Sequence, residues 1–139
     1  MDILVVEDEA ALRHTIRAAL VASGHRVLEA ETGLQALARL RESRPDLVVL
    51  DLQMPEMSGW EFLPRLRAWP GCADVPVIVT SAAHRLSLDG ADIQAFFEKP
   101  FDLDALLDTI DALLAARQQA GSRAAAAACE VSGGGQGEA

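Results

Sequence analysis

The stretch LVVLD at residues 47–51 decides the fold of this chain, because it places a carboxylate at the end of a purely apolar run. Two other stretches have a similar form: ILVVED at residues 3–8 and AFFEK at residues 95–99. Apolar runs of this length are too short for helices and are typical of buried strands in a parallel sheet. Charged side chains therefore follow three predicted strands at their carboxyl ends.

The charged residues that follow these strands predict a metal site. Ligands of an open α/β sheet bind outside the carboxyl ends of its strands. The residues expected to meet at this edge are Glu7, Asp8, Asp51 and Lys99. Carboxylates about 4 Å apart repel one another by roughly 4 kcal/mol per pair at an effective dielectric of about 20. A cation is expected to offset that repulsion, and oxygen ligands favour a hard ion such as Mg²⁺.

Predicted strands and helices alternate along the chain, which indicates an α/β fold with a parallel sheet covered on both faces. The predicted strands are residues 3–6, 26–30, 47–51, 75–80 and 95–98, and the predicted helices are residues 9–23, 34–43 and 59–68, with a last helix capped by Asp102. The flavodoxin-like strand order 2-1-3-4-5 is one of two common doubly wound orders. Only a short fourth helix fits between Thr80 and the fifth strand.

Length and composition favour one folded domain followed by a tail. The chain has 139 residues, of which 50% are hydrophobic, and this is enough for one core within residues 1–117. Residues 118–139 are rich in Ala and Gly. They are predicted to form a flexible low-complexity tail, or a helical extension that breaks near Gly121.

Charge, hydropathy and cysteine usage narrow the function classes. The net charge of −9 argues against binding to nucleic acid or to an anionic membrane surface. No apolar run approaches the ~20 residues that span a bilayer, so no membrane insertion is expected, and the first residues lack the basic segment of a signal peptide. Cys72 and Cys129 have no partner pattern, so a reducing, cytoplasmic location is predicted.

Asp51 is the residue best suited to chemistry. Its carboxylate is ionised at neutral pH and can attack phosphorus without a general base. Cations must neutralise the two anions that meet, a role open to Mg²⁺ on Asp8 and Asp51 and to the Lys99 ammonium. Thr80, at the end of the fourth predicted strand, could donate a hydroxyl hydrogen bond to the same phosphoryl group. Taken singly, each of these residues also has an ordinary interpretation as a helix cap, a strand residue or a solvated charge.

Four motifs carry this pattern: VVEDE at residues 5–9, DLQMPEMSG at residues 51–59, VTSA at residues 79–82 and EKPF at residues 98–101. Together they resemble the receiver domain of two-component response regulators, over about residues 1–117. The resemblance implies a (βα)₅ fold and phosphoryl transfer from a histidine of a sensor kinase or phosphotransfer protein to Asp51. It also implies a regulatory phosphoacceptor rather than a dedicated enzyme, in which phosphorylation switches binding to a downstream protein or passes the phosphoryl group along a relay.

The resemblance also assigns roles to individual residues. The implied ligands of Mg²⁺ are Asp8 directly, Glu7 through water, Asp51, and Gln53 through its backbone carbonyl. Thr80 would be the switch hydroxyl and Lys99 the phosphate-binding ammonium. Phe96 would rotate into the space that Thr80 vacates, although simple core packing is the alternative interpretation of this aromatic residue.

The sequence departs from the family pattern between Thr80 and Lys99, where the segment is short. This weakens the case for a regular fourth-helix output surface and for the usual dimerisation mode, so a monomer or a weak, phosphorylation-dependent dimer is expected. The residues after 117 are too few and too polar for a DNA-binding or enzymatic output domain. We therefore expect a stand-alone receiver, similar to a chemotaxis regulator; the alternative is a receiver cut from a larger protein.

Two other function classes stay open at this point. A phosphatase with an aspartyl-phosphate intermediate usually carries a second Asp two positions after the nucleophile, where this chain has Gln53. A phosphate-independent interaction module would keep the fold around a relic pocket, and the intact set of charged residues argues against it.

Four further residues have candidate roles outside this set. Gly59 provides either a close backbone approach or unusual φ at a helix start, or a plain turn. Arg13 and Arg17, on the first predicted helix, are either contacts for a kinase or part of a solvated face. Trp60 follows Gly59 directly and would serve as an optical reporter if it lies close to Asp51.

Overall fold

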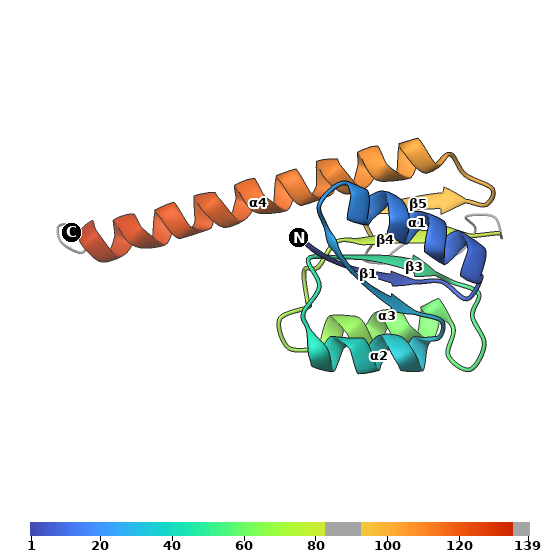
Figure 1. Ribbon diagram of the computed structural model, residues 1–139. Helices are drawn as coiled ribbons and strands as arrows, with labels where there is room; N and C mark the ends of the chain where they lie inside the picture. The colour runs from blue at the N-terminus through green and yellow to red at the C-terminus, as the bar shows by residue number, and fades with distance from the viewer. Residues whose placement is uncertain (83–92, 135–139) are drawn as a thin grey trace.

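A central parallel sheet lies between two layers of helices in the computed structural model, which describes residues 1–82 and 93–134 (Figure 1). The strands are β1 Asp2–Val6, β2 Arg26–Ala30, β3 Leu47–Asp51, β4 Val77–Ser81 and β5 Ala95–Glu98. Their order is β2-β1-β3-β4-β5, and every pairing is parallel. The predicted α/β fold with flavodoxin-like strand order is therefore confirmed.

Helices cover both faces of this sheet. The helices of the described ranges are α1 Ala10–Ala22, α2 Gly33–Glu42, α3 Gly59–Ala68 and α4 Leu103–Gly134. α2 and α3 lie on one face, and α1 and α4 lie on the other (Figure 1). Successive residues of a strand point to opposite faces, so β1 contributes Leu4 and Val6 to one apolar cluster and Ile3 and Val5 to the other.

The position of a strand in the sheet explains how clearly its sequence predicted it. β3 and β4 are buried along their whole length and β1 nearly so, because helices cover both faces, and these strands consist almost entirely of apolar residues. β2 and β5 form the two edges and are only partly buried. The edge strands therefore accept polar residues, such as Arg26 and Glu29 of β2.

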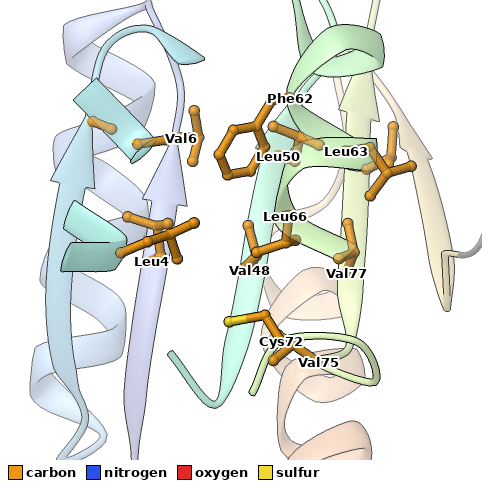
Figure 2. Close-up of a cluster of buried hydrophobic side chains, with 14 of the residues drawn as sticks. Leu4, Val6, Val48, Leu50, Phe62, Leu63, Leu66, Cys72, Val75 and Val77 are labelled. Carbon is orange, nitrogen blue, oxygen red and sulfur yellow. The ribbon is translucent and has the colours of Figure 1, made fainter. Parts of the chain in front are cut away.

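Phe62 of α3 is the bulkiest fully buried side chain among the described residues. Figure 2 shows Phe62 and Leu66 of α3 beside Leu50 and Val48 of β3. This packing holds α3 against the strand that ends in Asp51. The core on the α2–α3 face therefore fixes the direction in which β3 presents its last residue.

Replacing Phe62 with Ala is expected to lower the free energy of unfolding by about 3–5 kcal/mol, because it removes a fully buried aromatic ring and leaves a cavity. Urea unfolding followed by circular dichroism measures the loss. Trp60→Ala is the matched control, since it removes a large aromatic ring from the same helix at a position that is 41% exposed. Equal losses in the two variants would contradict the described packing.

Several element boundaries differ by one or two residues from the prediction, and two of them have a clear local cause. β4 begins at Val77 instead of residue 75, since Pro76 has no N–H with which to extend the ladder; its carbonyl accepts a hydrogen bond from Val48 N at 3.0 Å. α2 begins one residue earlier than predicted, at Gly33, where the Thr32 side chain accepts a hydrogen bond from Gln35 N.

The last helix is longer than predicted. Asp102 caps it as expected, with its Oδ1 accepting a hydrogen bond from Asp104 N at 3.2 Å. α4 then continues for 32 residues to Gly134, past residue 117 and without a break at Gly121, and it projects well beyond the sheet (Figure 1). Alanine has the highest helix propensity of all residues, which favours this continuation through residues 124–128. The flexibility expected of residues 118–139 stays a prediction.

Two further points concern the limits of the described ranges. The short fourth helix predicted between Thr80 and the fifth strand falls largely on residues 83–92, which lie outside the described residues. Within the described ranges, none of the helices has the length and apolar character needed to cross a membrane.

Candidate functional site

The register of the sheet brings the ends of four strands to one edge. Asp51, the last residue of β3, is paired with Thr80 of β4, and Thr80 is paired with Phe97 of β5. β1 ends beside β3, with Val6 paired with Leu50. The residues that follow β1 and β5 therefore lie next to Asp51, as expected of parallel strands that end together.

Lys99 lies between two buried carboxylates. Its Nζ is 3.0 Å from a carboxylate oxygen of Glu7 and 3.3 Å from Asp51 Oδ2. Burial of the Lys99 ammonium works against its charge, but hydrogen bonds to Glu7 and Asp51 and the attraction of both carboxylates outweigh this, so the pKa of Lys99 is raised. The ammonium therefore stays charged and offsets part of the negative charge at this edge.

Three carboxylates gather where a metal ion would fit. Glu7, Asp8 and Asp51 each offer an oxygen atom, and these atoms all lie within 4.8 Å of one another. Glu7 and Asp51 are both 1% exposed, whereas Asp8 is exposed. Two buried carboxylates and one accessible carboxylate form a hard oxygen donor set, which suits Mg²⁺ and leaves room for the water that this ion usually retains.

The Asp51 carboxylate is perturbed in the absence of a metal ion. Burial raises the pKa of Asp51 to about 7, although the hydrogen bond from Gln53 N to Asp51 Oδ1 (3.1 Å) lowers it. The nearby Glu7 charge and a hydrogen bond with Asp8 raise this pKa, and Lys99 lowers it. The raised pKa indicates that the Lys99 ammonium does not offset the burial of Asp51, and that a further cation would stabilise the ionised carboxylate.

We expect the metal-free protein to lose stability as the pH rises from about 4 to about 7. Asp51 ionises near its ordinary pKa of 3.8 in the unfolded chain but only near 7 in the folded protein. Between these values the folded protein holds a proton that the unfolded chain has released. The free energy of unfolding therefore falls with rising pH and levels off above about pH 7.

Urea unfolding in EDTA across this pH range checks the prediction, with Asp51→Asn as the control. The variant lacks this titration, so its excess stability over the wild type should be smallest near pH 4 and should reach about a few kcal/mol near pH 8. A difference that does not change with pH would contradict the raised pKa.

The Thr80 hydroxyl is buried without a hydrogen-bond partner. Thr80 is 1% exposed, and its Oγ1 has no partner within the described part of the chain. Buried hydroxyls are usually satisfied, so an exception calls for an explanation. Because Thr80 is paired with Asp51 across the β3–β4 ladder, its hydroxyl is suited to meet a group that arrives on Asp51.

Gln53 and Phe96 lie close to these residues in different ways. Gln53 follows β3 with an exposed side chain, so its contact with Asp51 is made by the backbone. Phe96 of β5 is partly buried and packs against the cluster on the α2–α3 face. Its register partner is Val79, the residue before Thr80.

Gly59 permits a close approach between α3 and the end of β3. A Cβ at this position would lie 2.7 Å from the backbone oxygen of Asp51 and 2.8 Å from Leu52 Cα, which is too close for any side chain. Gly59 N also donates a hydrogen bond to Leu52 O at 3.0 Å. Of the interpretations offered for Gly59, close backbone approach is the one that holds; residues 52–59 are closed into a tight loop behind the carboxylate.

Sequence reasoning misplaced Arg13. It grouped Arg13 with Arg17 as an exposed residue, but Arg13 is buried, and its Nη1 donates a hydrogen bond to the backbone oxygen of Glu7 at 3.0 Å. The available signal was helical spacing: Arg13 precedes the buried Ile16 and Leu20 by three and seven positions, which places it on the covered face of α1.

Comparison with known proteins shows the family to which this chain is related. The family model described as "Response regulator receiver domain" matches residues 3–111. The chain is 39% identical over 109 residues to the Escherichia coli KDP operon transcriptional regulatory protein KdpE, an alignment that covers 76% of this chain and 47% of that protein. This chain spans about half the length of the curated relatives that it matches.

Solved structures share the fold. The response regulator TrrA of Thermotoga maritima, determined in complex with Mg²⁺-BeF, is 31% identical and has a TM-score of 0.71, covering 81% of this chain and 97% of that chain. The Vibrio cholerae chemotaxis protein CheY4 is 25% identical and has a TM-score of 0.75, covering 81% of this chain and 97% of that chain.

Proposed function

Since the chain belongs to the response regulator receiver domain family, we propose that it accepts a phosphoryl group on Asp51 from a phosphohistidine of a sensor kinase or phosphotransfer protein. One observation carries the proposal: the Lys99 ammonium lies between the buried Glu7 and Asp51 carboxylates at the edge where four strands end. A structural ion pair would need only one carboxylate beside the ammonium. A phosphoacceptor site needs the ammonium together with more than one carboxylate.

The proposed reaction is a displacement at phosphorus. A carboxylate oxygen of Asp51 attacks, a P–O bond forms, the P–N bond to the donor histidine breaks, and the electron pair goes to the imidazole nitrogen. Mg²⁺ held by Asp8, Asp51 and the Gln53 carbonyl, with Glu7 acting through water, would supply positive charge for the two anions that meet. Lys99 is already 3.3 Å from Asp51 and would transfer its hydrogen bond to a phosphoryl oxygen.

The proposed response begins at Thr80. Its buried, unpartnered Oγ1 would donate a hydrogen bond to the new phosphoryl oxygen. The movement of Thr80 toward the phosphoryl group would open space beside Phe96. The phosphoryl charge shifts the population between two packings only to the extent that it binds one of them better. The changed surface would then bind a downstream protein, which makes the chain a regulatory domain of the cytoplasm rather than a metabolic enzyme.

Intact mass measured after incubation with acetyl phosphate and Mg²⁺ tests the proposal. We expect a gain of one phosphoryl group, which EDTA prevents. Beryllofluoride binding, followed by Trp60 fluorescence, covers the case in which hydrolysis is faster than the measurement. No response in either assay would favour a phosphate-independent interaction module, and turnover of a generic phosphomonoester would favour a phosphatase.

A further inference from the structure

We propose that Arg13 is a positioning residue for the acidic site: its guanidinium fixes the backbone from which Glu7 and Asp8 extend and thereby sets the affinity for Mg²⁺. The inference rests on the proposed function, in which these carboxylates hold the ion. Arg13 touches neither the ion nor the phosphoryl group and acts only through Glu7.

The backbone of Glu7 is held from two sides. Its N–H donates to Ala30 O at 3.0 Å, in continuation of the β1–β2 ladder. Its carbonyl accepts from Arg13 Nη1 at 3.0 Å, in a hydrogen bond that is buried. Because Glu7 lies directly after β1, this second bond fixes the peptide that joins Glu7 to Asp8, where the strand turns toward α1.

Arg13 is itself held in place by Glu29 of β2. Its Nε donates to Glu29 Oε1 at 3.1 Å, so the planar guanidinium bridges a carboxylate on one side and the Glu7 carbonyl on the other. The Arg13 side chain is only 8% exposed. A fork with both ends engaged and little freedom to move is well suited to hold a peptide plane.

Arg17 provides a matched control. Its Nε lies 3.2 Å from Glu29 Oε2, the other oxygen of the same carboxylate, but its side chain is 50% exposed. The structure gives Arg17 no hydrogen bond to Glu7 within the described ranges. The two arginines share a helix, a charge and a partner, and they differ in the bond to the Glu7 backbone.

A positioning role of Arg13 and a purely electrostatic role predict opposite changes in the affinity for Mg²⁺. Removing a positive charge near an acidic cluster favours Mg²⁺ by simple electrostatics, so a charge effect would tighten binding. Loss of positioning weakens Mg²⁺ binding, because Asp8 is exposed and depends on its backbone, together with a hydrogen bond to Asp51 itself, to stay within reach of Asp51. Residues that orient metal ligands typically change metal affinity about 10- to 100-fold when replaced.

Isothermal titration of the metal-free chain with Mg²⁺ tests the inference. We expect Arg13→Met to raise Kd about tenfold or more and Arg17→Met to change it less than about twofold. Arg13→Lys keeps the charge without the fork and should resemble Arg13→Met. Glu29→Gln, which loosens Arg13 and leaves it in place, should raise Kd several-fold and supplies the test if Arg13→Met does not fold.

Thermal unfolding of each metal-free variant distinguishes the positioning role of Arg13 from a purely structural role. A purely structural role would lower Tm and leave the Kd for Mg²⁺ unchanged. An unchanged or lower Kd in the Arg13 variants, or an equal rise in Arg17→Met, would overturn the role of Arg13 while the proposed function stands. Absence of Mg²⁺ binding by the wild-type chain would overturn both.

Discussion

Asp51→Asn is expected to abolish phosphorylation by acetyl phosphate, with no gain of mass under conditions that modify the wild-type chain. The amide has no anionic oxygen with which to attack phosphorus, yet it is nearly the same size as the carboxylate. Its oxygen can keep the hydrogen bond from Gln53 N that Asp51 Oδ1 accepts at 3.1 Å. The fold of the loop should therefore survive, and the loss reports chemistry alone.

Asp108→Asn is the matched control for this variant, because Asp108 is an exposed carboxylate on α4, far along the chain from the site. It should gain the phosphoryl group as the wild type does. If Asp51→Asn gained mass at the wild-type rate, the acceptor would lie elsewhere, and the neighbouring carboxylates of Glu7 and Asp8 would be the first to replace.

Lys99→Ala is expected to leave the protein able to take up the phosphoryl group, more slowly, but unable to respond to it. The ammonium connects Asp51 to Glu7, and without it the new phosphoryl oxygens lose the cation that would draw the end of β5 toward Asp51. The readout is the change in Trp60 fluorescence on beryllofluoride binding, which should be present in the wild type and absent in the variant. A normal response in Lys99→Ala would contradict this role.

The same substitution should also destabilise the metal-free protein by about 3 kcal/mol, because it leaves buried carboxylates without their cation. This is near the low end of the range for such pairs, since Asp51, with its pKa of about 7, can take up a proton. Added Mg²⁺ should restore much of the loss. Arg26→Ala, which removes the ion pair between the exposed Arg26 guanidinium and Asp2, is the control and should cost less than about 1 kcal/mol.

The fold and the charged residues of the site could be predicted from the sequence for one physical reason. A buried parallel strand must be apolar, so the first charged residue after LVVL at residues 47–50 marks both the end of β3 and the start of the polar edge. The same reasoning located Glu7, and Lys99 follows the last strand, which ends at Glu98. Neither charge could lie alone in the apolar core, and at this edge of the sheet each one is compensated by the other.

The remaining features depend on contacts that no local pattern contains. Arg13 looks like a solvated charge until Glu29 and the Glu7 carbonyl are found beside it. The unpartnered hydroxyl of Thr80 is a property of its surroundings, since the residue alone is an ordinary strand former. The length of α4 was underestimated because its apolar stripe ends near Leu114, whereas the helix continues on alanine propensity.

Lys99 is the single lysine of the chain, so the amine between Glu7 and Asp51 is also the only side-chain amine that an acylating reagent can find. Its raised pKa makes the neutral, nucleophilic amine scarce at neutral pH. Any ion or modification that draws either carboxylate away from the ammonium changes the fraction of Lys99 that is present as the neutral amine. The acylation rate at one nitrogen atom is thereby a chemical record of the charge state of the whole site.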